Sequence, residues 1–385
     1  MKQCVIILLS VFIFTQISHA QLTGTITGKL PQLAYSNGED RLGSAKMGYI
    51  DTGIVLPVID SVNELYHVAL SKNHSAYIDK KQLAIKADTA KQKTALTESW
   101  SVRGDSIFDY VSISLSKKIA YKSWLELSPA KIVVDLYGVM SNTNWITQLQ
   151  SAKEVKGIAF EQTEDDVVRL TISLKHQQPW GYSIGFRGRS LQIKIKQFPA
   201  KRQLKNMVIA IDAGHGGTNT GASGLTAGVQ EKNYTLLFAK ELQKILKRKH
   251  ATVIMTRDND TSFDNKDRVL FLQQQWPDLF VSFHLNSSSR ATAQGVSTYY
   301  KHVAYRPFTQ AMLKRLLAIE GLKEFGNVGN FNFQPIQPTE FNSSLVEVAF
   351  LSNAEDEKLI LDETFRKKVA TQVYKGMKDF LKKVK

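Results

Sequence analysis

The chain contains the run Met207-Val208-Ile209-Ala210-Ile211-Asp212-Ala213-Gly214-His215-Gly216-Gly217, in which an apolar segment passes directly into a glycine-rich turn. A short continuous apolar run bounded by turn residues is typical of a buried strand. The glycines around His215 remove side chains and permit positive φ, so other groups can approach the imidazole closely. The run predicts a buried strand with a histidine at its end, although a tight turn with an incidental histidine has the same pattern.

The sequence on the C-terminal side of this run alternates between strand-like and helix-like patterns. Apolar runs predict strands over residues 252–255, 279–284 and 345–350, and helical periodicity predicts helices over residues 233–248, 268–275, 308–319 and 364–383. Such alternation indicates an α/β domain with a mainly parallel sheet covered by helices on both faces. Polar side chains at the ends of its strands are therefore candidates for chemistry.

Three further polar residues stand at such positions. Glu231 begins the first predicted helix, where an acidic residue can also serve only the helix dipole. His284 ends an apolar strand, where it can equally be a core histidine satisfied by hydrogen bonds. Glu347 lies inside Leu345-Val346-Glu347-Val348-Ala349-Phe350, and burying a lone carboxylate is costly unless it is paired, neutralised or close to a metal. A salt bridge from Glu347 to Arg257 or Arg268 is the structural alternative to a catalytic role.

Considered together, two histidines and two glutamates satisfy the needs of a catalytic metal site. Zinc requires about three nitrogen or oxygen ligands, an open position for water and a nearby acid that moves protons. The only cysteine, Cys4, lies at the extreme N-terminus, so a metal site would use His, Asp and Glu, which favours zinc or a harder cation over thiolate clusters.

The same residues carry a resemblance to a known family. The relevant segments are Ile209-Ala210-Ile211-Asp212-Ala213-Gly214-His215-Gly216-Gly217, Glu231-Lys232, Thr256-Arg257, residues 278–286 and residues 345–353. In order and spacing they resemble the zinc amidase-3 family of N-acetylmuramoyl-L-alanine amidases. The resemblance implies a Zn²⁺ ion held by His215, Glu231 and His284, with Glu347 as catalytic acid/base and with Asn286 and Arg257 as substrate contacts. It also implies hydrolysis of the amide between the lactyl group of N-acetylmuramic acid and L-alanine, for cell-wall remodelling or daughter-cell separation.

One segment departs from the family pattern. Residues 331–338 read Phe331-Asn332-Phe333-Gln334-Pro335-Ile336-Gln337-Pro338, where family members commonly have a Leu-x-Val-Leu-Arg type of sequence. The departure concerns substrate contacts and leaves the implied metal ligands intact. Some relatives carry an additional autoinhibitory helix before the last glutamate. Here the interval from His284 to Glu347 contains one clear amphipathic helix, so we expect no plug over the site.

The N-terminal half has the period-two patterns of β-structure. Residues 91–203, through Pro129-Ala130-Lys131-Ile132-Val133-Val134-Asp135-Leu136 and Val168-Arg169-Leu170, resemble the wall-targeting AMIN domain. Residues 21–90 weakly resemble a bacterial SH3-like domain, with residues 86–98 as a polar linker. The expected organisation is therefore a signal peptide (1–20), an SH3-like domain (21–90), an AMIN-like domain (91–203) and a zinc amidase domain (204–385).

The N-terminus and the charge indicate where such a protein acts. Lys2, an apolar run over residues 5–14 and Ser18-His19-Ala20 are typical of a secretory signal, which predicts export to the periplasm or cell envelope without stable membrane insertion after cleavage. The formal net charge of +15 favours an anionic partner. We find no RNP-like, helix-turn-helix or zinc-finger pattern and expect no nucleic-acid ligand. Peptidoglycan is the expected partner, and the sequence indicates nothing about an activator protein.

Two other functions remain compatible with these residues. A non-catalytic peptidoglycan-binding protein would keep the fold without turnover, and a zinc peptidase would cut within the stem peptide. Intact His215, Glu231, His284 and Glu347 argue against the first, and identification of the products separates the second from an amidase.

Overall fold

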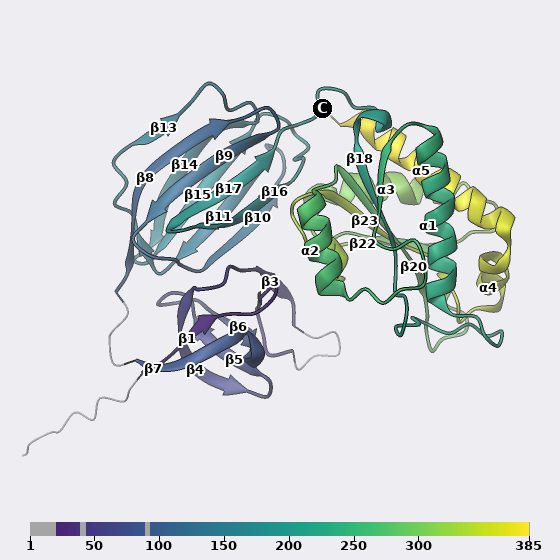
Figure 1. Ribbon diagram of the computed structural model, residues 1–385, viewed down its shortest axis with the longest axis horizontal. Helices are drawn as coiled ribbons and strands as arrows, with labels where there is room; N and C mark the ends of the chain where they lie inside the picture. Colours follow the sequence, from purple (N-terminus) through teal and green to yellow (C-terminus); the bar gives the residue numbers. More distant parts are fainter. Residues whose placement is uncertain (1–20, 39–43, 89–92, 385) are drawn as a thin grey trace, which may run out of the picture.

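The computed structural model describes residues 21–38, 44–88 and 93–384, which form three consecutive domains (Figure 1). The predicted signal peptide, with Cys4, lies outside the described residues. No helix in the described part of the chain combines the length and apolar character needed to cross a membrane.

The first unit, residues 21–88, is here called the N-terminal domain. Its seven strands form one sheet in the order β3-β2-β6-β5-β4-β1-β7. The strands are β1 (Gln21–Ile26), β2 (Gln32–Ala34), β3 (Lys46–Tyr49), β4 (Val55–Val62), β5 (Leu65–Ala69), β6 (Ser75–Asp79) and β7 (Leu83–Asp88), with a short 3₁₀ turn η1 (Lys80–Gln82) before β7. Its core includes Ile26, Ile54 and Val68, none of which is exposed.

The second unit, residues 95–196, is here called the sandwich domain. One sheet has the order β10-β11-β15-β14, and the other has the order β12-β8-β9-β17-β16 with β13 paired to β8. The strands are β8 (Ala95–Gly104), β9 (Phe108–Leu115), β10 (Tyr121–Glu126), β11 (Lys131–Tyr137), β12 (Val139–Met140), β13 (Ile146–Gln148), β14 (Val155–Glu164), β15 (Val167–Leu174), β16 (Tyr182–Arg187) and β17 (Ser190–Lys196). Along β9 every second residue is buried, as period-two patterning requires for strands with one face in a core.

The N-terminal region is therefore all-β, as predicted. The predicted linker is wrong over most of its described length, because β7 extends to Asp88 and β8 begins at Ala95. Its polar residues misled the prediction: Thr97 and Glu98 alternate between buried and exposed positions, as residues of a strand do.

The third unit, residues 204–384, is here called the α/β domain. Its sheet has the order β19-β18-β20-β23-β21-β22, in which only the pair β21 and β23 is antiparallel. The elements are η2 (Leu204–Asn206), β18 (Val208–Ala213), α1 (Glu231–Arg248), β19 (Thr252–Met255), α2 (Asn265–Gln275), β20 (Leu279–Asn286), β21 (Val296–Tyr299), η3 (Val303–Tyr305), α3 (Arg306–Leu316), β22 (Glu324–Val328), η4 (Gln334–Ile336), β23 (Asn342–Phe350), α4 (Ala354–Leu361) and α5 (Glu363–Lys383).

Two apolar cores flank this sheet. Helices α1, α3 and α5 pack together on one face, around residues such as Phe238, Phe308 and Phe380. On the other face, a smaller core joins Leu272 of α2 to Phe280 and to Ile336 of η4. The carboxyl ends of β18 and β20 thus lie side by side, at the edge where the polar candidates emerge.

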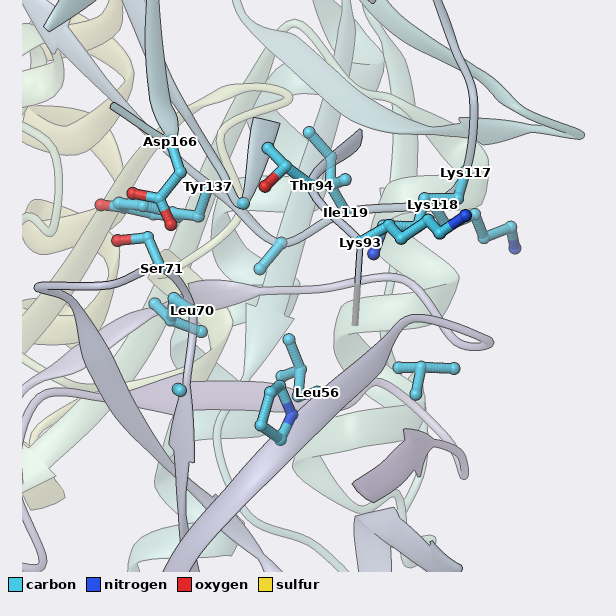
Figure 2. Close-up of a pocket in the computed structure, with 15 residues that line it drawn as sticks. Leu56, Leu70, Ser71, Lys93, Thr94, Lys117, Lys118, Ile119, Tyr137 and Asp166 are labelled. Atoms are coloured by element: carbon cyan, nitrogen blue, oxygen red, sulfur yellow. The ribbon is translucent and has the colours of Figure 1, made fainter. Parts of the chain in front are cut away.

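The three domains share apolar and polar contacts. Trp180 leaves the sandwich domain to join the core of the α/β domain, and its indole N–H donates to Asp278 Oδ1 at 3.0 Å. Tyr305 of η3 is fully buried in the sandwich core. Figure 2 shows the junction between the N-terminal domain and the sandwich domain, where Leu56 and Leu70 of the former face Ile119 of the latter.

All three domains also line one cavity of about 230 Å³, which contains the side chain of Glu340. Its carboxylate accepts a hydrogen bond from Gln273 Nε2 at 2.9 Å. Burial raises the pKa of Glu340 to about 7 despite this hydrogen bond. His302 lines the same cavity, and burial lowers its pKa to about 4, so no cation from this histidine compensates an ionised Glu340 near neutral pH.

We expect Glu340 to make the protein less stable as the pH rises. The folded state holds this proton more tightly than the unfolded chain, so the stabilisation is complete below about pH 4.5 and is lost as the pH rises through about 7. Above that, the ionised group costs about 3 kcal/mol. Glu340→Gln should therefore match the parent Tm at pH 4 and exceed it at pH 8, as measured by calorimetry. The same Tm difference at both pH values would contradict this assignment.

Candidate metal centre

His215, Glu231 and His284 come together at the carboxyl ends of β18 and β20 and the first turn of α1. Their ligand atoms all lie within 4.8 Å of one another. One oxygen, Glu231 Oε1, lies 3.0 Å from His215 Nε2 and 3.1 Å from His284 Nδ1. Two ring nitrogens and one carboxylate oxygen aimed at one point are the donor set expected for a mononuclear zinc site.

Further contacts orient these three side chains. His215 Nδ1 lies 2.9 Å from Asn219 Oδ1, which would fix the tautomer that leaves Nε2 free for a metal. Glu231 accepts backbone N–H bonds from Ala222 and Leu285, both at 2.9 Å. Burial acts to raise the pKa of Glu231, but the hydrogen bonds from His215 and His284 lower it well below its usual range. Glu231 is therefore anionic at neutral pH, as a carboxylate ligand of a metal ion would have to be.

Two glycines provide the space for the cluster. A Cβ on Gly214 would lie 2.3 Å from the His284 ring, and a Cβ on Gly221 would lie 2.5 Å from Glu231 Oε2. The absence of a side chain at Gly214 lets the His284 ring lie against the turn that carries His215. His215 itself has φ of 62°, a left-handed conformation that costs energy for a non-glycine residue.

Two buried arginines hold this turn. The Arg257 guanidinium donates to the carbonyl oxygens of Ala213 and Gly214 at 2.9 and 3.0 Å, and Arg268 donates to those of Ala213 and His215, both at 3.0 Å. Arg257 is only 4% exposed, and its remaining donors reach Lys232 O, Asn259 O and Thr235 Oγ1. The expectation that Arg257 contacts substrate is therefore wrong, since its N–H groups are committed to the protein.

Replacing Arg257 should weaken metal binding without removing a ligand. Arg257→Ala removes one donor from each of the carbonyl oxygens of Ala213 and Gly214, which keep only the bonds from Arg268 and Thr235. We therefore expect an affinity for zinc about 10- to 100-fold lower. Competition with a chromophoric chelator would measure this, with Arg248→Ala, at the exposed end of α1, as the control. Equal affinities of the two variants would show that the clamp does not support the site.

Glu347 lies on β23 opposite His284 of the neighbouring parallel strand. It is 6% exposed, and its Oε2 has no hydrogen-bond partner among the described residues. Burial raises the pKa of Glu347 well above its usual range, and the negative charge of Glu231 adds to the effect. The structural alternative fails, because Arg268 pairs with Asp212 and Arg257 binds carbonyl groups.

Asn286 ends β20 close to Tyr299 of β21, a residue that the sequence analysis missed. Burial raises the pKa of Tyr299, the Glu347 charge adds to this rise, and hydrogen bonds from Ser297 and Asn286 oppose it. Tyr299 therefore shares an environment with Glu347 and Asn286. Tyr299 ends the strand Val296-Ser297-Thr298-Tyr299, and no motif in that run marks it as a site residue.

These features define a class: an α/β domain whose adjoining strand ends and helix start bring two histidines and a glutamate close enough to hold a metal ion, beside a buried carboxyl group. Residues 209–379 match the Amidase_3 family, described as N-acetylmuramoyl-L-alanine amidase. This match supports the family resemblance seen in the sequence. It lies within the α/β domain, and the SH3-like and AMIN-like assignments stay predictions.

Individual proteins show the same similarity. The chain is 32% identical over 197 residues to a protein of Staphylococcus epidermidis named "Probable cell wall amidase LytH", which covers 50% of this chain and 64% of that protein. It is 32% identical over 192 residues to the protein of that name from Staphylococcus aureus, covering 49% and 63%. The chain thus spans less than two thirds of these relatives. The solved catalytic domain of CwlV, an N-acetylmuramoyl-L-alanine amidase from Bacillus (Paenibacillus) polymyxa var. colistinus, aligns with a TM-score of 0.44 and 35% identity, covering 46% of this chain and 98% of that domain.

Proposed function

We propose that the chain hydrolyses the amide bond between the lactyl group of N-acetylmuramic acid and L-alanine in peptidoglycan. The observation that supports this most directly is the convergence of His215, Glu231 and His284 beside buried Glu347, within the segment that matches the amidase family. An oxygen- and nitrogen-ligated cluster without cysteine fits zinc. When bound, zinc would polarise the scissile carbonyl and acidify water.

The chain itself would supply positioning and proton transfer. His215, Glu231 and His284 would hold the ion, and the clamp of Arg257 and Arg268 would keep His215 in place. Glu347 would take a proton from the attacking water and return it to the leaving nitrogen. The water oxygen adds to the lactyl carbonyl carbon and the C–N bond breaks, which leaves a lactyl carboxyl group and a free α-amine on L-alanine. Asn286 remains our candidate for a substrate contact.

The rest of the chain would bring this site to the cell wall. Residues 1–20 would direct export to the periplasm or cell envelope, and the SH3-like and AMIN-like domains would bind peptidoglycan. The formal charge of +15 favours anionic wall material. Cell-wall remodelling or daughter-cell separation would be the cellular role.

Digestion of purified sacculi by the zinc-loaded mature protein tests the proposal. We expect peptides with a free N-terminal L-alanine and glycan strands that carry unsubstituted lactyl groups, identified by mass spectrometry. Cleavage between stem residues would instead identify a peptidase. Binding to sacculi without released products would identify a non-catalytic binding protein.

A further inference from the structure

The segment between β22 and β23, residues 329–341, is here called the aromatic loop. It contains the sequence that departs from the family pattern. The Phe333 ring lies parallel to that of His284, with centroids 6.4 Å apart and an interplanar angle of 8°. Phe331 and Phe333 pack with centroids 4.5 Å apart, and both meet Tyr299 edge-on at 5.1 and 5.2 Å. Because both phenylalanines are only half-buried, they form an apolar wall beside the metal cluster.

A lysine of the same domain fixes the start of this loop. Lys301 Nζ donates to Asn330 Oδ1 at 3.0 Å and to Asn332 Oδ1 at 2.9 Å. Gln337 Nε2 donates to the carbonyl oxygen of Asn332 at 2.9 Å. The backbone around Phe331 and Phe333 is therefore held by side chains that lie outside the metal cluster.

The two N-terminal domains hold the remainder of the loop. Gln32 of the N-terminal domain donates from Nε2 to the side-chain oxygen of Gln337. In the sandwich domain, Tyr182 N donates to Thr339 O at 2.9 Å, and Thr339 Oγ1 donates back to Tyr182 O at 2.7 Å. The approach is close: a Cβ on Gly181 would lie 2.0 Å from the carbonyl oxygen of Glu340.

We propose that the aromatic loop is a substrate-binding wall of the metal site, that Phe333 is a specificity-determining residue, and that Lys301 and Gln32 are positioning residues that hold the wall. This inference rests on the proposed function. The wall packs against apolar groups of the substrate next to the scissile amide. These are either the C–H face of the sugar ring or the methyl groups of the lactyl and alanyl units. Since Phe333 lies parallel to the His284 ring and Gln32, which holds the loop, belongs to another domain, the non-catalytic domains help to set the shape of the site.

The test uses the full mature chain, because Trp180 and Tyr305 interlock its domains. Binding of a muramyl peptide is measured by calorimetry in a zinc-loaded Glu347→Gln background, and kcat and KM are measured in the otherwise unaltered chain. We expect Phe333→Ala to weaken binding and raise KM about tenfold, the effect of losing part of one buried aromatic contact. Zinc content should stay at the parent level. A ligand without the sugar distinguishes the sugar face from the methyl groups. If Phe333→Ala weakens binding of this ligand as well, the wall contacts the methyl groups.

The positioning residues are tested by variants that touch no substrate. Lys301→Met and Gln32→Leu should each raise KM about threefold with kcat nearly unchanged, and should increase hydrogen exchange at residues 329–341. Lys301→Arg should recover most of the parent KM. Gln150→Leu, at an exposed sandwich residue, is the matched control.

Two results would overturn the inference while leaving the proposed function intact. One is a parent enzyme that cleaves sacculi while Phe333→Ala keeps the parent affinity. The other is Gln32→Leu and Lys301→Met matching Gln150→Leu in KM and in hydrogen exchange. Failure of the proposed function gives a different result, because the zinc-loaded parent would then release no peptide with a free N-terminal L-alanine.

Discussion

Glu347→Gln should lower kcat for hydrolysis of a soluble muramyl peptide by about 10²- to 10⁴-fold, the usual contribution of a general acid/base. Gln has nearly the shape of Glu, but it can neither accept a proton from water nor return one to the leaving nitrogen. Because Glu347 lies outside the three-residue cluster, zinc content should remain at the parent level. Turnover is followed by release of free amino groups, and zinc by mass spectrometry.

A matched control separates loss of chemistry from loss of a buried carboxyl group. Glu154→Gln makes the same substitution at a buried carboxyl group of the sandwich domain, which lies outside both the metal cluster and the aromatic loop. We expect Glu154→Gln to keep the parent kcat within a few fold. If Glu347→Gln kept it as well, Glu347 would not be the acid/base.

Patterns in the sequence indicated two histidines and two glutamates as candidates, and the resemblance to the amidase family implied which three of them would hold a metal. Apolar runs located β18 and β20, and parallel neighbours necessarily bring their carboxyl ends together, which places His215 near His284. The predicted helices correspond to α1, α2, α3 and α5, with ends shifted by up to three residues. The short helix α4 was missed, since eight residues carry little periodicity.

The errors concern side chains whose direction the sequence does not encode. Arg257 follows a strand end as a substrate contact would, but its guanidinium turns inward to the carbonyl groups of the His215 turn. Tyr299 comes near Glu347 through the pairing of β21 with β23, which no local pattern in the sequence predicts. One contact of the aromatic loop joins Gln32 to Gln337, 305 positions apart in the sequence, and only the folded chain shows it.

Removal of one of the two histidines of the metal cluster should greatly weaken zinc binding and, with it, activity. Outer contacts of zinc ligands are each worth about 10- to 100-fold in affinity, so loss of a ligand in His284→Ala should exceed about 10²-fold. We expect about one zinc per chain in the parent after dialysis and strongly reduced zinc in His284→Ala and His215→Ala. Activity should fall in parallel, and a chelator should abolish it in the parent until zinc is restored.

A control variant shows whether loss of zinc and activity is specific to the two histidines of the metal cluster. His250→Ala removes an exposed imidazole beyond the end of α1 and should leave zinc content and activity unchanged. The apo parent should remain folded, because the two apolar cores that flank the sheet of the α/β domain include none of the three cluster residues. His284→Ala that still retained one zinc per chain would place the ion elsewhere. Reduced zinc in a chain with the parent's circular dichroism spectrum would instead assign the ion to this cluster, since a general loss of structure would alter the spectrum.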